Sequence, residues 1–208
     1  MTPIDLNADI GEGFVDMPLL EAITSANVAC GFHAGGEQVA RPLCAAAAER
    51  GIAIGAHISY RDRPGFGREE LGTPAAVVAE EAREQIALLQ EWSGGRVTYV
   101  KPHGALYHRM RRDDDVAAAI AAAGLLVLGL DVSEGFADRG YRGDGLIPRG
   151  EPGALLNPDE AVAQAVRLAR AGTFRSICLH GDSPGAVALA VRLRDALAAA
   201  GFELAPFA

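Results

Sequence analysis

Residues 97–107 read Val-Thr-Tyr-Val-Lys-Pro-His-Gly-Ala-Leu-Tyr, an apolar and β-branched run that breaks directly into Lys101 and His103. Pro102 cannot donate a ladder hydrogen bond and keeps Lys101 extended, so strand pairing should stop there. Gly104 then lets the chain turn away without obstruction by a side chain. The stretch predicts a strand that delivers a cation and an imidazole to its own C-terminal end, unless both side chains simply face solvent.

Three of the other four histidines share this context, because each ends a short apolar run and precedes small, polar or glycine-rich sequence. They are His33 after residues 26–32, His57 after residues 52–56 and His180 after residues 176–179. In a chain that alternates strands with helices, this position places all four imidazoles on one face of a parallel sheet. His108 is the exception, because arginines follow it, and we expect it on a solvated, charged turn.

Composition sets further bounds. Half of the 208 residues are hydrophobic, which suits one domain over residues 1–208. The net charge of −8 argues against nucleic acid or an anionic membrane as a partner, because the basic surface is missing. The N-terminus lacks the regions of a signal peptide, and no apolar stretch approaches the ~18 residues of a membrane helix. We therefore expect a cytoplasmic protein.

The cysteines predict no disulfide framework. Cys30, Cys44 and Cys178 are odd in number, have apolar neighbours and lack the paired spacing of a zinc site. We expect buried, reduced thiols.

Apolar runs and cap signals predict alternating strands and helices. The expected strands cover residues 4–6, 26–30, 52–56, 97–101, 125–130 and 177–179, and a polar, glycine-punctuated loop is expected over residues 7–13. The expected helices cover residues 17–23, 37–50, 74–91 and 113–123, with two more from residues 157 and 183. Start signals are Thr73 with Pro74, Asn157, and Ser183 with Pro184, and Gly51 is a stop signal.

The fold class that follows is α/β, a parallel βα barrel-like sheet of seven strands or a shortened six. A regular eight-unit barrel needs about 250 residues, so this one is short by a unit or incompletely closed.

Two connections are unusual. Residues 132–136 follow the strand at 125–130 so closely that no crossover fits between them, which leaves one bent strand or a shortened βα unit. Residues 58–68 are too aromatic and glycine-rich for a plain connector, and they predict a functional or lid-like loop.

In such a fold the active site lies at the C-terminal ends of the strands. The ionisable residues expected there are Asp9, His33, His57, Lys101, His103, Glu134, Asp138, Arg139, His180 and Asp182. Two mechanisms stay open: Asp9 with two histidines ligates a divalent metal that activates water, or carboxylates set histidine protonation for acid–base work without a metal. Lys101 and Arg139 would hold an anionic group or a developing oxyanion.

Simpler interpretations remain for several residues. Asp9 can be a turn acid or a helix N-cap, and Asp182 can serve merely as a cap of the last helix. Residues 65–67 can form a mere tight turn with Phe66 on the rim, and Arg68 can be a surface residue.

Seven pieces in order resemble the LamB/YcsF (lactam utilisation) family across nearly the whole chain. They are residues 5–12 (Asp-Leu-Asn-Ala-Asp-Ile-Gly-Glu), 25–35 (Ser-Ala-Asn-Val-Ala-Cys-Gly-Phe-His-Ala-Gly), 55–57 (Gly-Ala-His), 65–68 (Gly-Phe-Gly-Arg), 100–107 (Val-Lys-Pro-His-Gly-Ala-Leu-Tyr), 136–139 (Phe-Ala-Asp-Arg) with Tyr141, and 180–186 (His-Gly-Asp-Ser-Pro-Gly-Ala).

The resemblance implies a seven-stranded barrel-like fold related to polysaccharide deacetylases and some glycosidases. It also implies conversion of 5-oxo-L-proline to L-glutamate by an ATP-dependent 5-oxoprolinase, in which a chain of this family works beside two partners, subunits B and C. ATP with its Mg would serve the complex, and a divalent metal is a further option.

Site roles follow from the motifs and the resemblance together. We predict catalytic roles for Asp9, His33, His57, Lys101, His103, Glu134 and His180. We predict substrate contacts for Asn7, Glu12, Arg68, Asp138, Arg139 and Asp182. Candidate metal ligands are Asp9, His33 and His57.

The chain departs from the family pattern in length. Members usually run longer, and the segment before Glu134 is abbreviated by roughly one strand–helix unit of the ~30-residue βαβ scale. The connection before Ile177 is also short, and Ile58 replaces a common proline. Two alternatives to the oxoprolinase function are a stand-alone metal-dependent amidase or deacetylase, and a non-catalytic lactam- or sugar-binding protein of a complex.

Overall fold

The computed structural model describes residues 1–14, 16–143, 145–182 and 185–208. A curved sheet follows the order β5-β4-β3-β2-β1-β9-β6, and β10 pairs with the start of β1. Its strands, all parallel, are β1 (Thr2–Ile10), β2 (Ser25–Ala29), β3 (Ala53–Ile58), β4 (Val97–Pro102), β5 (Leu126–Val127), β6 (Glu134–Phe136), β9 (Ser176–His180) and β10 (Phe202–Leu204). β7 (Tyr141–Arg142) and β8 (Gly145–Leu146) pair antiparallel in a separate ribbon.

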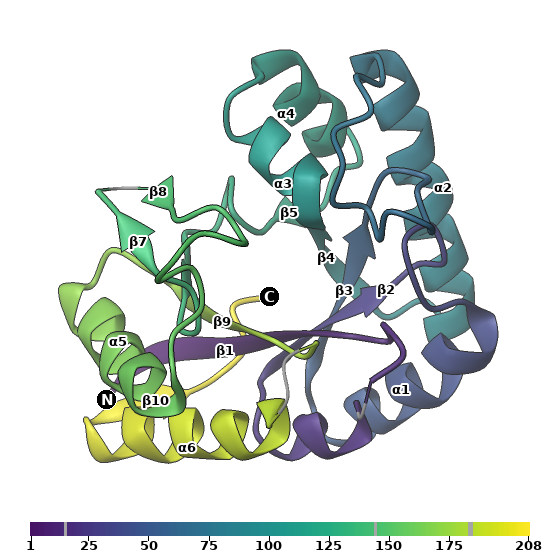
Figure 1. Cartoon of the computed structure of the whole chain (residues 1–208). Coiled ribbons are helices and arrows are strands. Elements are labelled where there is room, and N and C mark those ends of the chain that lie inside the picture. Colours follow the sequence, from purple (N-terminus) through teal and green to yellow (C-terminus); the bar gives the residue numbers. More distant parts are fainter. Residues whose placement is uncertain (15, 144, 183–184) are drawn as a thin grey trace.

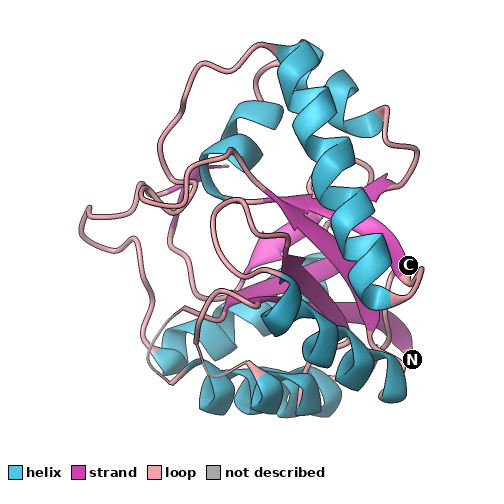
Figure 2. Cartoon of the chain, turned by 90° about the vertical axis from the view of Figure 1, so that its right-hand side faces the viewer, coloured by secondary structure: helices cyan, strands magenta, loops and turns pink. Residues whose placement is uncertain are grey.

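Helices cover the outside of the sheet. They are the 3₁₀ helix η1 (Met17–Glu21) and the α-helices α1 (Glu37–Glu49), α2 (Ala75–Ser93), α3 (Gly104–Met110), α4 (Asp114–Ala121), α5 (Pro158–Ala171) and α6 (Ala186–Ala199). Figure 1 shows them arranged around a partial ring of strands. In Figure 2 they lie along two sides of the sheet, and long loops gather on another side. The α/β, barrel-like prediction is confirmed. None of the helices within the described ranges has the length and apolar character that spanning a bilayer requires.

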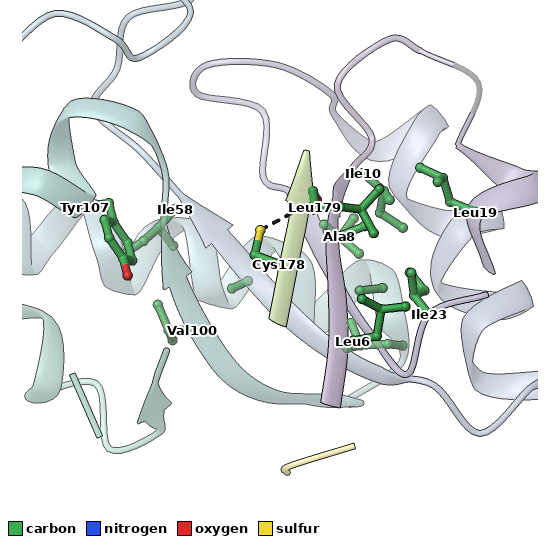
Figure 3. Packing of buried hydrophobic residues seen from close by; sticks show 14 of the residues in the cluster. Leu6, Ala8, Ile10, Leu19, Ile23, Ile58, Val100, Tyr107, Cys178 and Leu179 are labelled. Atoms are coloured by element: carbon green, nitrogen blue, oxygen red, sulfur yellow. Dashed lines mark hydrogen bonds between the residues drawn. The ribbon is translucent and has the colours of Figure 1, made fainter. Parts of the chain in front are cut away.

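Strict alternation along β1 creates the two sides of the sheet. Leu6, Ala8 and Ile10 are buried in the outer core with Leu19 and Ile23, as Figure 3 shows. The residues between them are polar and are also buried, so they face the inside of the ring. The loop predicted from residue 7 is therefore wrong as far as Ile10, because the strand continues through it. Asp9 lies on this strand, so it is neither a turn acid nor a helix cap.

Residues 97–107 fold as predicted up to Pro102, where β4 ends. The next turn is different, because His103 is the N-cap residue of α3, and His108 is exposed on this helix rather than on a turn. Gly104 adopts φ +53°, and a Cβ there would lie 2.5 Å from the carbonyl oxygen of Gly67. Close backbone approach thus requires glycine at this position.

Helix-boundary predictions had mixed outcomes. Asn157 forms the expected cap, accepting from the amides of Asp159 and Glu160. Gly51 follows α1 with φ +68°, as a stop signal should. Thr73 does not cap α2, whose N-cap residue is Pro74 without a side-chain hydrogen bond. The last helix begins after Gly185, and the predicted start at Ser183 and Pro184 lies outside the described residues.

Strands β5 and β6 lie at opposite edges of the sheet, since β5 pairs with β4 and β6 pairs with β9. The single bent strand is therefore wrong, and a missing βα unit explains the short connection. The C-terminal Phe207 packs against Tyr99 with ring centroids 4.7 Å apart, in a small cluster with Leu128 and Val132. Neither this cluster nor β10 was predicted from the sequence.

The three cysteines are free and buried, as predicted.

Candidate functional site

A ladder of polar side chains fills the inside of the ring, and it begins at Asp5. The Asp5 carboxylate accepts hydrogen bonds from the hydroxyls of Thr24 and Ser25, both at 2.6 Å, and from Ser176. Burial raises the pKa of Asp5 to about 6, against the opposing effect of these hydroxyls. The group is therefore a buried anion held by uncharged donors.

The next layer consists of amides. Asn27 donates to Asn7 Oδ1 at 2.8 Å and to Asp9 Oδ1 at 2.9 Å, and the Tyr99 hydroxyl donates to Asn27 Oδ1 at 2.7 Å. A Cβ at Gly55 would lie 2.2 Å from the Tyr99 ring, so glycine leaves room for the tyrosine. Asn7 thus organises the layer beneath the site rather than lining the cavity.

Lys101 ends the ladder between two carboxylates. Its Nζ lies 2.8 Å from Asp9 Oδ1, 3.0 Å from Glu134 Oε1 and 3.1 Å from Cys178 Sγ, and only 2% of the residue is exposed. Burial lowers the pKa of Lys101, but Asp9 and Glu134 outweigh burial and hold it well above its ordinary value. Burial raises the pKa of Asp9, but His57 and Lys101 hold it well below its ordinary value. The lysine charge is thus balanced inside the protein, so its geometry does not match the expected role of holding a substrate anion.

Glu12 meets three imidazoles at the C-terminal ends of the strands. Its Oε1 lies 3.0 Å from His33 Nε2, 3.3 Å from His103 Nδ1 and 3.5 Å from His57 Nε2. The rings of His33 and His103 stack at 4.0 Å. Burial lowers the pKa of His33 to about 3 and also lowers the pKa of His103. These two histidines are therefore neutral at neutral pH.

Backbone carbonyls determine which ring nitrogens are free. His57 Nδ1 lies 3.1 Å from the carbonyl oxygen of Lys101, and His103 Nε2 lies 2.9 Å from that of Phe66. Because a carbonyl only accepts, each of these nitrogens carries the proton in the neutral ring. The other two, His57 Nε2 and His103 Nδ1, then turn their lone pairs toward each other at 3.0 Å and toward Glu12.

Such a convergence requires a cation, which is either a shared proton or a metal ion. Imidazole nitrogens and a carboxylate oxygen form a donor set that suits a divalent transition metal. The four ligand atoms of Glu12, His33, His57 and His103 all lie within 4.8 Å of one another. This group contains His33 and His57 of the predicted set and adds Glu12 and His103, whereas Asp9 lies beside it, with Oδ1 accepting from Lys101 and Oδ2 3.5 Å from His57 Nε2.

The loop at residues 59–68 has more than a turning role. Phe66 adopts φ +54° and supplies the carbonyl that accepts from His103 Nε2. A Cβ at Gly67 would lie 2.1 Å from Ser59 Oγ and 3.0 Å from His103 Cδ2. The glycine lets this loop lie directly against the histidine, which rules out a mere rim turn.

His180 forms a pair with Asp138 on the opposite side of the site. Its Nδ1 lies 2.9 Å from Asp138 Oδ1, and its backbone amide donates to Asp138 Oδ2 at 3.1 Å. Burial lowers the pKa of His180, but Asp138 outweighs burial and raises it above the ordinary value. The ring also stacks on Phe136 at 5.7 Å. His180 is thereby oriented and kept ready to carry a proton.

A cavity of about 450 Å³ opens above these groups. The predicted site residues that line it are Asp9, Glu12, His57, Arg68, Lys101, His103, Arg139, His180 and Asp182. Asn7, His33, Glu134 and Asp138 do not line it, and instead each contacts a residue that does. The predicted residues therefore lie together, nine of them at the cavity and four directly behind these.

The arginines at the cavity have different partners. Arg139 is buried, and its Nε and Nη2 donate to the carbonyls of Ala154 and Ile147 at 3.0 and 2.7 Å. Arg68 is exposed and forms an ion pair with Asp182. Asp182 does not cap α6, because Gly185 occupies the N-cap position. Arg139 thus braces residues 147–154 against the site.

Sequence reasoning missed part of the wall: Tyr107, His108, Leu146, Ile147, Pro148 and Arg149. Tyr107 follows His103 by one helical turn, so a predicted α3 would have found it. Residues 146–149 carry no comparable signal in the sequence, because the hydrogen bonds from Arg139 to the backbone of Ile147 and Ala154 place them at the cavity.

Comparison with known proteins identifies the family. The sequence matches the LamB/YcsF family over residues 4–127 and 124–208. It is 47% identical to the 5-oxoprolinase A subunit of Streptomyces avermitilis, covering 99% of this chain and 100% of the relative. The corresponding protein of Nocardia farcinica is 45% identical, covering 99% of both chains. The first alignment spans 249 residues against 208 in this chain, so the relative carries a stretch that this chain lacks.

Solved structures agree with this result. A lactam utilization protein from Thermus thermophilus matches with a TM-score of 0.87 and 32% identity, covering 100% of both chains. A family 4 carbohydrate esterase from Streptomyces lividans matches with a TM-score of 0.65 and 16% identity, covering 100% of this chain and 93% of the esterase. The esterase shows a shared fold only. This chain belongs to the LamB/YcsF family.

Proposed function

We propose that this chain is the A subunit of an ATP-dependent 5-oxoprolinase and that its cavity is where 5-oxo-L-proline is opened to L-glutamate. The observation that carries the proposal is the convergence of Glu12 with three imidazoles, of which His57 and His103 line, together with Glu12, a cavity of about 450 Å³. Relatives named as the A subunit of 5-oxoprolinase, at 45% and 47% identity, support the choice of substrate.

The chemistry needs a base and an acid. Hydrolysis forms a bond between a water oxygen and the ring carbonyl carbon, breaks the ring C–N bond and gives a proton to the ring nitrogen. Glu12 and the free nitrogens of His57 and His103 can accept the proton of the attacking water. His180, whose pKa is raised by Asp138, can deliver a proton to the leaving nitrogen. Glu134 and Asp9 act through Lys101, which they fix in place.

ATP belongs on the partner subunits B and C in this proposal. A lactam is a stable amide, and transfer of the terminal phosphoryl group of ATP to its oxygen, with release of ADP, would activate the carbonyl carbon. Attack of water and cleavage of the C–N bond then leave an acyl phosphate, and a second water hydrolyses it to glutamate and inorganic phosphate. The chain has a single lysine, Lys101, and this is already paired with two carboxylates. It is therefore not available to the phosphates of ATP and its Mg.

A divalent metal would be held by His33, His57, His103 and Glu12, where it would supply Lewis-acid activation of water. Without it, the same residues hold and move the proton of the attacking water.

The test is glutamate release from 5-oxoproline, measured with this chain alone and with subunits B and C, in each case with and without ATP. We expect glutamate only from the full mixture with ATP. His103→Ala should abolish it, whereas Arg192→Ala, on the exposed face of α6, should not. Glutamate formed by the chain alone without ATP would contradict the proposal.

The converging lone pairs also favour a second candidate, a stand-alone metal-dependent amidase or deacetylase. That function predicts stoichiometric divalent metal in the purified chain and release of acetate from acetylated amino sugars without ATP. No glutamate from the full mixture, together with such release, would establish it in place of the oxoprolinase.

A further inference from the structure

Positive charge collects on one wall of the cavity although the chain as a whole carries −8. Arg139 and Arg149 carry this charge, and they line the cavity together with His108. The floor carboxylates Asp9 and Glu12 are already engaged by Lys101 and the imidazoles. They are not free to balance the wall.

The carboxylates beside the wall also have other partners, because Asp138 pairs with His180 and Asp182 pairs with Arg68. Asp182 forms a second, longer ion pair with Arg149, whose Nη1 lies 3.9 Å away, beyond a hydrogen bond. Among the residues that the structure describes, no hydrogen-bond acceptor is found for Arg149, and one third of its side chain is exposed. The guanidinium is therefore available to a ligand in the cavity.

Arg139 adds a buried charge without a full counter-charge. Its two hydrogen bonds go to uncharged carbonyls, and Nη1 has no acceptor among the described residues. Burial lowers the pKa of Arg139 and Arg149 lowers it further, with Asp138 and Asp182 offsetting only part. Partial burial of its ring also lowers the pKa of His108, although the residue keeps an exposed part, and repulsion from nearby arginines, Arg139 foremost, adds to this. His108 is thus neutral at neutral pH, whereas Arg139 and Arg149 repel each other, so an anion between the two arginines would be favoured.

We propose, on the basis of the proposed function, that His108, Arg139 and Arg149 form a subsite for the carboxylate of the lactam substrate. A planar guanidinium matches a carboxylate in two parallel hydrogen bonds, which gives direction as well as affinity. The apolar side chains of Phe136, Ile147 and Pro148 lie along the same cavity and suit the faces of a small ring. The carboxylate then points to this wall while the ring carbonyl points to Glu12.

The charge distribution explains how the ring is oriented. In 5-oxoproline the carboxylate and the lactam carbonyl flank the ring nitrogen on opposite sides. A cavity that is cationic at one wall and holds bases at its floor accepts this molecule in one orientation. Arg149 is accordingly a specificity residue and not a base or an acid in the reaction.

Calorimetric titration of the full chain tests the subsite, using 5-oxoproline and 2-pyrrolidinone, the same ring without the carboxylate. We expect 5-oxoproline to bind at least about tenfold more tightly, the scale of one charge-assisted hydrogen-bonded pair. Arg149→Ala should remove most of this preference, Arg149→Lys should restore part of it, and His108→Gln should weaken it. Arg142→Ala is the matched control, because Arg142 pairs with Glu151 outside the cavity and should change nothing.

The preference for the carboxylate is a readout that a merely structural role of Arg149 would not move. The subsite proposal would be overturned if the unsubstituted chain bound the two rings equally. It would also be overturned if Arg149→Ala kept the preference unchanged, or if 5-oxoproline did not bind at millimolar concentration. Competition with inorganic phosphate distinguishes a carboxylate site from a phosphate site. If phosphate displaces no 5-oxoproline, the carboxylate assignment stands. If phosphate binds while the two rings bind equally, the wall is a phosphate site. Failure of the proposed function is distinct, because the full mixture would then form no glutamate while the carboxylate preference remained.

Discussion

The polar residues of β1 show where the sequence misled, because Asp5 was correctly predicted in a strand whereas Asn7 and Asp9 were predicted in a loop. Residues 4–10 alternate apolar and polar without a break, a strand pattern whose polar members face one side. The polar letters suggested a loop, because a buried polar side needs partners that only distant strands supply. Those partners, Thr24, Ser25 and Ser176, become visible only in the folded sheet. By contrast, the four strand-end histidines were predictable from local sequence alone.

Asp5→Asn should change how stability depends on pH. The folded pKa of Asp5, about 6, exceeds its ordinary value of 3.8, so the folded state binds the proton more tightly. This contribution to stability is fully present below the unfolded pKa and is lost as pH rises through about 6, a loss of about 3 kcal/mol. The free energy of unfolding of Asp5→Asn, relative to the unsubstituted chain, should therefore rise by up to that amount between about pH 4 and pH 7.

Urea unfolding across this pH range measures the difference. Thr2→Ala, at the exposed start of the same strand, is the control and should give a curve parallel to that of the unsubstituted chain. Parallel curves for Asp5→Asn as well would show that Asp5 does not carry the pH dependence.

Elements whose boundaries depend on local chemistry were predicted well. The cap at Asn157, the stop at Gly51 and the end of β4 at Pro102 each rest on neighbouring residues. The placement of β5 and β6 at opposite edges could not be predicted, because strand pairing is decided by tertiary contacts. The ribbon β7–β8 was missed for the same reason, because it leads into residues 147–154, which Arg139 positions by donating hydrogen bonds to the carbonyls of Ile147 and Ala154.

Helix α5 fixes one side of the site through Gln164. Its Nε2 lies 2.8, 3.2 and 2.7 Å from the carbonyl oxygens of Phe136, Ala137 and Arg139, the segment that carries Asp138. Gln164→Leu leaves these buried acceptors without a donor, at a cost of about 1–3 kcal/mol. We expect that loss in urea unfolding, with weaker binding of 5-oxoproline. Gln38→Leu, exposed on α1, is the control, and equal stability of the two variants would contradict this account.

The whole molecule is an incomplete ring. The two segments that match the family meet at residues 124–127, next to β5, where the connection to β6 is short. The missing unit therefore lies where the sheet is open. The site is retained even though Glu134 lies on the edge strand β6, because the strands that carry its residues, β1, β3, β4, β6 and β9, are all present. The sequence predicted both the abbreviation and the survival of the site.

Phe207 covers part of the open side, and its removal should be felt globally. The ring packs on Tyr99, which itself supports Asn27 through its hydroxyl. Phe207→Ala should lower the free energy of unfolding by at least about 1 kcal/mol, the scale of an aromatic pair. Val191→Ala, exposed on α6, serves as the control. Unchanged urea unfolding of Phe207→Ala would mean that the tail does not stabilise the ring.

The central claim is that the Glu12 and histidine floor performs the ring opening. The direct measurement is glutamate and ADP formed by the complete mixture containing Glu12→Gln, which keeps the size of the side chain and removes its charge. We expect glutamate formation to fall by about 10²-fold or more, the usual contribution of a positioned base. Glu37→Gln, exposed on α1, should match the unsubstituted chain. Glutamate formation by Glu12→Gln at the unsubstituted rate would contradict the claim.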